Sequence, residues 1–282
     1  MTTTCPICSG TGWKPGGDDG STRVTRCDCW REQLRDRFLA EAQIPPRYRK
    51  CDLDGFRTDT DSLIRAVQKC HAFISAFPVV DKGLLFIGAP GVGKTHLAAA
   101  ILKEVIRRTG ARGLFFDVRE LLRLIRDTYN PVVRTTEFQV IKPVVEAELL
   151  VLDDVGAEKT SEWVDETMNL IVNTRYNYRR PTIFTSNYLD LEPGERSVAE
   201  VLVERVGERI YSRLHEMCEF VSMKAVDYRK VGEDASPEAL ARLEKHGRSL
   251  TEKGLPARGK PARAHLRDGK ADLKWPGGRA GT

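Results

Sequence analysis

Three features are missing from this sequence, and each absence narrows the possible classes of protein. No apolar run approaches the ~20 residues that a transmembrane helix needs. The first 20 residues are polar and glycine-rich, unlike a signal peptide. No segment recurs at a fixed period, which argues against a repeat architecture. We therefore expect a cytoplasmic protein with no membrane partner, and its 282 residues leave room for one substantial domain plus extras.

Excess charge is missing from most of the chain. Residues 254–282 contain seven Lys/Arg and two Asp, which accounts for the whole formal charge of +5. The remaining 253 residues are net neutral, so the basic balance describes the end of the chain and says little about the folded part. We expect residues 231–282 to be a disordered basic tail, because they have too little apolar area to offset chain entropy.

A glycine-rich loop at residues 88–95 organises the rest of the sequence, with the form G-x-x-x-x-G-K-[ST]. A short apolar run, 84–87, precedes it, and 96–108 follow with helical periodicity. Strand, glycine loop and helix are the context that a phosphate-binding loop requires. Lys94 would reach the β- and γ-phosphates, and the Thr95 hydroxyl would ligate Mg²⁺. The predicted nucleotide contacts are Gly88, Ala89, Pro90, Gly91, Val92, Gly93, Lys94, Thr95, His96 and Asp153.

A second apolar run, 149–152, ends in two carboxylates, the pattern of a buried strand that presents acids at its carboxyl end. We predict that Asp153 holds Mg²⁺ and that Asp154 orients or polarises the attacking water. Asn187 follows another predicted strand and would bind the γ-phosphate or the lytic water. Alternatively, it only caps the next turn. ATP and Mg²⁺ are therefore the expected cofactors.

Seven cysteines in a cytoplasmic chain argue for metal ligands or buried thiols rather than disulfides. Cys5 and Cys8 form one close pair, and Cys27 and Cys29 form a second, which suits a tetrahedral Zn²⁺ site. We predict that zinc stabilises this segment, which is too small to fold alone. The alternative is four free cysteines in a floppy arm. A short amphipathic helix follows at residues 31–42 and must dock on the core or on a partner.

Three arginines share one face of the helix that we predict after Asp117. Arg119, Arg123 and Arg126 lie opposite its apolar side chains. Such a stripe is either a solvated face or a row of guanidinium groups along a nucleic-acid backbone, and the residues alone leave both open. Further on, Pro143 interrupts the helical pattern of residues 132–148.

Together these motifs resemble the AAA+ ATPases, and more narrowly the bacterial replicative-helicase loaders and the related helper ATPases of insertion-sequence transposition. The resemblance covers roughly residues 44–229. Its marks are the segments Ile44-Pro-Pro-Arg-Tyr48, 84–96, 150–156 and 207–214. It implies an α/β fold, a parallel sheet flanked by helices with a small N-terminal zinc-binding module. Because only a strand and a polar tail follow residue 213, we expect no C-terminal lid.

The resemblance also implies roles for single residues. Asn187 matches the sensor-1 position, and Arg213 matches the arginine finger that reaches the ATP of a neighbouring subunit. Arg209, one turn earlier, is the second candidate for the finger. The helix that carries Arg119 would face single-stranded DNA. Most AAA+ proteins have Glu where this chain has Asp154, whose side chain is one methylene shorter, so the chain departs from the usual pattern at this position.

These inferences predict four segments. Residues 1–45 form a zinc-binding and partner-docking module, 46–80 a linker and leading helix, 81–230 the AAA+ ATPase domain and 231–282 the tail. The predicted function is ATP-gated loading of a DnaB-like replicative DNA helicase onto single-stranded DNA, by a protein that self-associates into a ring or spiral. The alternative is a transposition helper ATPase, which shares the ATPase motifs. A metabolite kinase and a passive zinc-and-DNA adaptor are more distant alternatives.

Overall fold

The computed structural model describes residues 5–15, 24–190, 201–230, 266–267 and 270–271. The chain divides into two compact units, Met1–Glu233 and Asp234–Thr282. In the second unit, β8 (Leu266–Arg267) pairs with the antiparallel β9 (Lys270–Ala271), which the sequence pattern did not predict. The rest of the predicted disordered tail lies outside the described residues.

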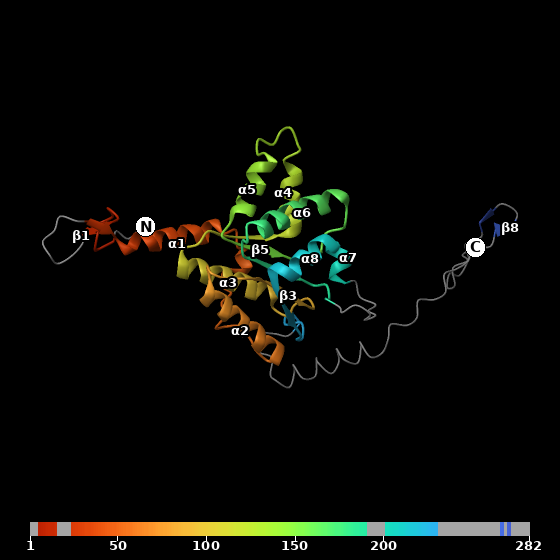
Figure 1. Ribbon diagram of the computed structural model, residues 1–282, viewed down its shortest axis with the longest axis horizontal. Helices are drawn as coiled ribbons and strands as arrows, with labels where there is room; N and C mark the ends of the chain where they lie inside the picture. The colour runs from red at the N-terminus through yellow and green to blue at the C-terminus, as the bar shows by residue number, and fades with distance from the viewer. Residues whose placement is uncertain (1–4, 16–23, 191–200, 231–265, 268–269, 272–282) are drawn as a thin grey trace, which may run out of the picture. The chain divides into compact units, whose positions relative to one another are not determined.

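A five-stranded parallel sheet forms the centre of the first unit (Figure 1). Its strands are β3 (Gly83–Gly88), β4 (Gly113–Asp117), β5 (Leu149–Asp153), β6 (Thr182–Ser186) and β7 (Cys218–Met223). They lie in the order β4-β5-β6-β3-β7, and every neighbouring pair is parallel. The carboxyl ends of β3, β5 and β6 therefore meet at one edge, where the glycine loop, the two acids and Asn187 follow them.

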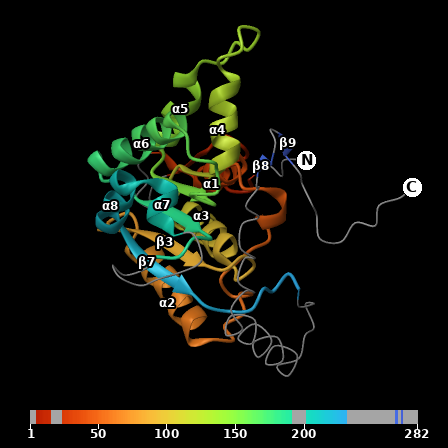
Figure 2. The same ribbon diagram turned by 90° about the vertical axis from the view of Figure 1, so that its right-hand side faces the viewer.

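Helices cover both faces of this sheet, as Figure 2 shows. One face carries α2 (Asp61–Ala76) and α3 (Lys94–Thr109), and the other carries α4 (Val118–Asp127), α5 (Glu137–Glu146), α6 (Glu162–Asn177), α7 (Leu202–Val206) and α8 (Glu208–Met217). Local residues define one end of each of two helices. Asp117 caps α4 by accepting two backbone hydrogen bonds, and Gly110 ends α3 in the left-handed conformation.

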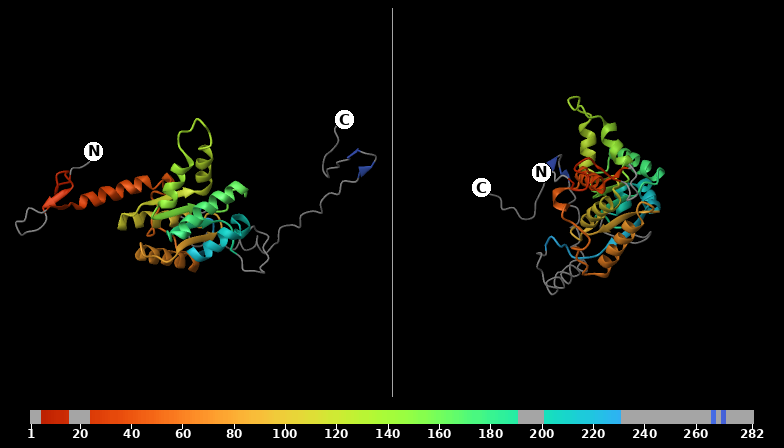
Figure 3. Two further views of the ribbon diagram at one scale, coloured as in Figure 1. Left: turned by 45° about the horizontal axis from the view of Figure 1, so that its top comes forward. Right: turned by 90° about the vertical axis from the view of Figure 1, so that its left-hand side faces the viewer.

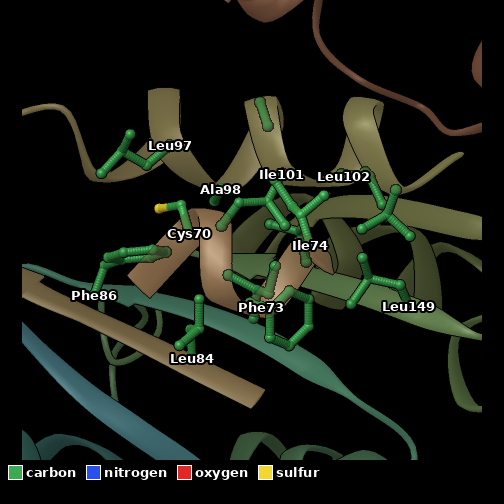
Figure 4. Packing of buried hydrophobic residues seen from close by; sticks show 14 of the residues in the cluster. Cys70, Phe73, Ile74, Leu84, Phe86, Leu97, Ala98, Ile101, Leu102 and Leu149 are labelled. Atoms are coloured by element: carbon green, nitrogen blue, oxygen red, sulfur yellow. The ribbon is translucent and has the colours of Figure 1, made fainter. Parts of the chain in front are cut away.

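Two hydrophobic clusters fill the space between the sheet and its helices. The central strands β3, β5 and β6 are buried along their whole length, which explains the continuous apolar runs of β3 and β5, whereas β6 buries Thr182, Thr185 and Ser186 as well. Side chains of β3 alternate between the clusters: Leu84 and Phe86 belong to one, Leu85 and Ile87 to the other. Figure 4 shows the first cluster, in which side chains of α2 and α3 pack over Leu84 and Phe86. This core fixes the strand ends that carry the site.

The helix α5 contains Pro143, although the sequence pattern indicated an interruption there. Proline removes one backbone donor inside the helix. Two other features stabilise α5. Thr136 and Gln139 form a reciprocal capping box at its start, and the fully buried Arg175 of α6 donates to the carbonyl oxygens of Val144 and Ala147 at its end, at 3.0 and 2.9 Å. Burial lowers the pKa of Arg175 to about 9.

The N-terminal part of the chain begins with β1 (Trp13–Pro15), which pairs with the antiparallel β2 (Val24–Arg26). The helix α1 (Asp28–Glu41) and the short 3₁₀ helix η1 (Pro46–Tyr48) follow. The end of α1 is tied to the core at two places: Arg35 donates to the carbonyl oxygen of Arg108, and the backbone N–H of Phe115 donates to Ala42. The second bond involves β4, which is the first strand in the sheet order. Residues 16–23, between β1 and β2, lie outside the described residues.

Helices α4 and α5 leave the sheet together, and residues 128–136 join their far ends (Figure 3). After β7, residues 224–230 contain no helix, and residues 231–265, where a lid would begin, lie outside the described part of the chain. Among the helices that the structure describes, none is both long enough and apolar enough to cross a membrane.

Candidate active site and metal centre

The glycine loop joins β3 to α3 and curls back over the sheet edge. Gly91 and Gly93 have φ angles of +83° and +100°, a region that L side chains rarely adopt. A Cβ atom on Gly91 would overlap the carboxylate of Asp227, and one on Gly93 would overlap the ring of Phe56. The loop is therefore enclosed by two segments distant in sequence, and its role as a phosphate cradle stays a prediction.

Lys94 begins α3 and is buried beneath this loop, with only 5% of its surface exposed. Its Nζ donates to the carbonyl oxygens of Gly88 and Ala89 at 2.8 Å, and to Oδ1 of Asn187 at 2.7 Å. Burial lowers the pKa of Lys94 to about 8, and the carboxylates of Asp154 and Asp153 oppose that shift. A buried ammonium held by neutral oxygens is well suited to bind phosphate oxygens.

The two acids at the end of β5 lie in different environments. Asp153 is buried and accepts a 2.6 Å hydrogen bond from the hydroxyl of Thr185, and burial raises its pKa to about 6. Asp154 is half-buried and has a φ of +58°, and its backbone N–H donates to the same Thr185 hydroxyl at 2.9 Å. Nδ2 of Asn187 donates to Oδ1 of Asp154 at 2.8 Å. The structure thus brings Lys94, Asp154 and Asn187 into one hydrogen-bonded group.

A cavity of about 790 Å³ opens beside these residues, within the range of small-molecule sites. Its lining includes Lys94, Thr95, His96 and both acids, together with side chains for which the sequence predicted no role. These are Pro45, Arg47, Tyr48, Cys51, Phe56 and Arg57 before α2, Asp117 at the end of β4, and Tyr228 and Arg229 after β7. The motif at residues 44–48 was noted as a family mark, and only the fold shows that it forms a wall of the cavity.

The cavity residues fit a nucleoside triphosphate with Mg²⁺. The loop offers backbone N–H groups at a helix N-terminus and a buried ammonium, which together suit phosphates. Thr95 and Asp153 offer the hard oxygen ligands that Mg²⁺ requires, and burial favours pairing of Asp153 with a cation. The donor set would therefore hold both groups.

The two candidate finger arginines lie on α8, and neither is among the described residues that line the cavity of their own chain. Nε of Arg213 donates to Oδ1 of Asn173 on α6 at 3.0 Å, and Nη1 donates to the carbonyl oxygen of Arg209 at 2.9 Å. Arg213 is half-buried, whereas Arg209 is exposed. The finger role remains a prediction for both.

The three predicted DNA-contacting arginines are all exposed on α4, as expected from the helical periodicity. Arg119 lies nearest the acids: its Nη2 is 3.4 Å from Oδ2 of Asp154. Arg126 lies over the ring of Trp163, with its Cζ 4.7 Å from the ring centroid, and Trp163 donates to the hydroxyl of Tyr129. The stripe therefore extends from the acidic site to a cluster of aromatic side chains, which the sequence did not predict.

The four predicted zinc ligands converge at the N-terminus. The sulfur atoms of Cys5, Cys8, Cys27 and Cys29 all lie within 4.8 Å of one another. The Sγ atoms of Cys5 and Cys27 are 3.8 Å apart, and those of Cys8 and Cys29 are 3.4 Å apart. Tetrahedral ligands at ~2.3 Å from zinc lie ~3.8 Å from each other. The cluster therefore fits Zn²⁺ in both donor chemistry and spacing.

The fold and the site define a class, the P-loop nucleotide-binding proteins. The glycine loop follows β3, the two acids lie at the end of β5, and β6 lies between these two strands. A model of the IstB-like ATP binding proteins matches residues 24–236, most of the chain. The protein belongs to this family.

Individual relatives agree with that placement. The replicative helicase loader DnaC of Escherichia coli (strain K12) is 28% identical over 184 residues, which cover 65% of this chain and 71% of that protein. A crystal structure of the DnaC helicase loader superposes with a TM-score of 0.56 at 36% identity, covering 64% of this chain and all of that one. A crystal structure of DnaI gives a TM-score of 0.54 at 26% identity, covering 64% and 95%. The expected AAA+-type fold is confirmed.

Proposed function

We propose that this protein is an ATP-dependent loader of a replicative DNA helicase onto single-stranded DNA. The relatives named as helicase loaders support this role. The observation that carries the choice is the convergence of four cysteine sulfurs within 4.8 Å at the N-terminus. Such a module gives the chain a partner-docking part besides its ATPase part, and a transposition helper needs no such module.

The residues of the cavity would have different roles in ATP hydrolysis. The loop amides and Lys94 bind the phosphates, while Thr95 and Asp153 hold Mg²⁺. Bound ATP supplies the γ-phosphoryl group whose transfer to water drives the cycle. Asp154 accepts a hydrogen bond from the attacking water and orients it, and Asn187 fixes Asp154 through its 2.8 Å hydrogen bond. These side chains position and stabilise charge, which is the main requirement of phosphoryl transfer.

Self-association completes the site. Arg213 or Arg209 of one subunit would reach the ATP of the next, so assembly depends on nucleotide state. Arg213 must then give up its bonds to Asn173 and to the Arg209 backbone, which makes its availability dependent on contact with a neighbour. This arrangement favours hydrolysis only within the assembled ring or spiral.

DNA would act on the same site through α4. Arg119 pairs with Asp154 at 3.4 Å and also belongs to the arginine stripe. A phosphate of single-stranded DNA competes with Asp154 for that guanidinium, and aromatic side chains beside Arg126 offer stacking surfaces for bases. DNA binding would thus release Asp154 to orient water.

The test is co-purification with the replicative helicase, followed by helicase loading onto single-stranded DNA, each with and without ATP. We expect the protein to retain the helicase, Cys8→Ser to lose it, and Lys94→Ala to retain it without loading. Lys94→Ala should weaken ATP binding by about 100-fold or more, because charge-assisted hydrogen bonds contribute about 1.5–3 kcal/mol each. Lys82→Ala, at the opposite end of β3, is the control and should bind ATP normally.

Other outcomes identify the other functions. Capture of a transposase instead of a helicase would favour the transposition helper. Phosphoryl transfer to a metabolite by a monomer would favour a kinase. No ATP turnover in the presence of both DNA and helicase would favour a passive adaptor.

A further inference from the structure

An arginine outside the cavity holds both of the loops that carry Asp154 and Asn187. Arg205 lies in α7, where Nε donates to the carbonyl oxygen of Gly156 at 2.8 Å and Nη2 donates to that of Glu158 at 2.7 Å. Its guanidinium also lies over the ring of Tyr188, 5.0 Å from the centroid. Gly156 follows Asp154 by two positions, and Tyr188 is the residue after Asn187.

The loop after Asp154 needs such an anchor because its backbone is unusual. Asp154 and Gly156 have φ angles of +58° and +87°, and a non-glycine residue persists in that region only when its surroundings fix it. The sheet holds the first half of the loop, since the N–H of Val155 donates to the carbonyl oxygen of Thr185 at 2.8 Å. The second half of the loop lies beyond the end of β5. There Arg205 donates hydrogen bonds to two of the loop's carbonyl oxygens.

The packing around Gly156 brings the side chains of Arg205 and Tyr188 together against its backbone. A Cβ atom on Gly156 would lie 3.0 Å from Cβ of Arg205 and 3.1 Å from the ring of Tyr188. A planar guanidinium can donate to two carbonyls and lie against an aromatic face at the same time. Arg205 therefore links the loop after β5 to the loop after β6.

We propose that Arg205 is a positioning residue for ATP hydrolysis, which acts within its own subunit by fixing the backbone beside Asp154 and Asn187. This inference rests on the proposed ATPase function. Arg205 is not among the described residues that line the cavity. Its loss should therefore change the hydrolysis step and leave nucleotide affinity intact.

The first experiment compares Arg205→Ala with Arg180→Ala. Arg180 is a matched control, because it is also half-buried, donates to the carbonyl oxygen of Val145 and lies over a tyrosine ring, but stands at the other end of β6. We expect Arg205→Ala to lower kcat about 10–100-fold, the effect of a small misplacement of a catalytic group. The Kd for ATP and the thermal midpoint should match those of Arg180→Ala. Equal kcat values for the two variants would overturn the proposal.

A subunit-mixing experiment then tests whether Arg205 acts in its own subunit. Lys94→Ala offers a finger without a working site, and the double variant Arg209→Ala/Arg213→Ala offers a site without a finger. A mixture of the two should recover hydrolysis at their junctions. Adding Arg205→Ala to the double variant should lower the recovered rate about 10–100-fold, whereas adding it to Lys94→Ala should leave the rate unchanged.

The outcomes distinguish a failure of the Arg205 proposal from a failure of the proposed ATPase function. If the parental mixture recovers nothing, the shared site between subunits is wrong, and the single-variant comparison alone decides on Arg205. If the mixture recovers activity and Arg205→Ala reduces it only on the finger-donating subunit, the positioning role beside Asp154 is wrong while the proposed ATPase stands.

Discussion

The nucleotide cavity and the cysteine module are two sites in one chain, and they relate to the fold in opposite ways. Burial raises the pKa of Asp153 to about 6 and lowers that of Lys94 to about 8. Burying these charged groups costs free energy, which the hydrophobic core around the sheet offsets. The described part of the module up to the end of α1, residues 5–15 and 24–41, has no such core: no residue of α1 is buried, and Cys8 and Cys27 are the buried side chains there. In the cavity the fold creates the site, whereas in the module the metal site would create the fold.

Removing zinc should have the largest effect and should be confined to the module. Structural zinc contributes about 10–16 kcal/mol in zinc-finger peptides, so Cys8→Ser or a strong chelator should unfold residues 5–15 and 24–26. Hydrogen exchange is the measurement. The amides of Ser9 and Cys27, which donate to Cys5 and Gly12, should lose protection, while amides of β3 and α3 keep theirs.

Cys70→Ala is the matched control, since Cys70 is fully buried in the core and lies outside the cluster. It should leave the zinc content unchanged and destabilise the core by about 1 kcal/mol. Metal analysis that finds no stoichiometric zinc would remove the basis of the comparison between the two sites.

Loss of the proposed arginine finger should have the next largest effect. It tests whether the cavity of one subunit can hydrolyse ATP without a residue from a neighbouring subunit. Arg213→Ala should leave the Kd for ATP unchanged and lower kcat by about 10³-fold or more, the contribution of such fingers in GTPases. Binding would then be a property of the single subunit and hydrolysis a property of the assembly. Steady-state turnover and equilibrium nucleotide binding measure the two separately.

Asn173→Ala is the control for this variant, because it frees Arg213 from its 3.0 Å hydrogen bond without removing the guanidinium. It should keep normal turnover. Normal turnover of Arg213→Ala would discard this residue as the finger, and a loss in Arg209→Ala would then transfer the role to its exposed neighbour.

The sequence predicted those parts of the cavity that depend on a continuous stretch of chain. The glycine loop, the two acids at the end of β5 and Asn187 after β6 each follow a predicted strand, and parallel strands bring their carboxyl ends together. The strand assignments and the helix after Asp117 could be predicted for the same reason, since periodicity is local.

The parts that were missed depend on contacts between distant segments. Tyr48, Phe56 and Arg229 reach the cavity only because the chain before α2 and after β7 encloses the loop. Arg205 gives no local signal either, because its partners are carbonyl groups that precede it by nearly fifty positions. Pro143 indicated a break in α5, and the buried Arg175 that satisfies the end of that helix comes from α6. Such side chains are identified by where the fold places them.

The smallest predicted effect concerns Arg119, at the exposed rim of the cavity. Its side chain is 53% exposed and lies 3.4 Å from the Asp154 carboxylate, so the pair contributes at most about 1 kcal/mol. Arg119→Ala should therefore change basal kcat by about fivefold or less, upward if the pair restrains Asp154. Single-stranded DNA should no longer stimulate the variant, because the competition for the guanidinium has been removed.

Arg123→Ala separates this effect from simple loss of DNA affinity, since Arg123 is exposed on the same face of α4. Each variant should reduce the salt dependence of DNA binding by about one phosphate contact. At saturating DNA, Arg123→Ala should recover full stimulation and Arg119→Ala should not. If both recover, α4 only binds DNA and the Arg119–Asp154 pair transmits nothing. If Arg119→Ala alone fails, an ion pair too weak to matter for stability links the DNA surface to the water-orienting carboxylate. Such a link requires that DNA can replace Asp154 as the partner of Arg119. The exposed pair allows this replacement, whereas the contacts of Lys94 and Asp153 are buried.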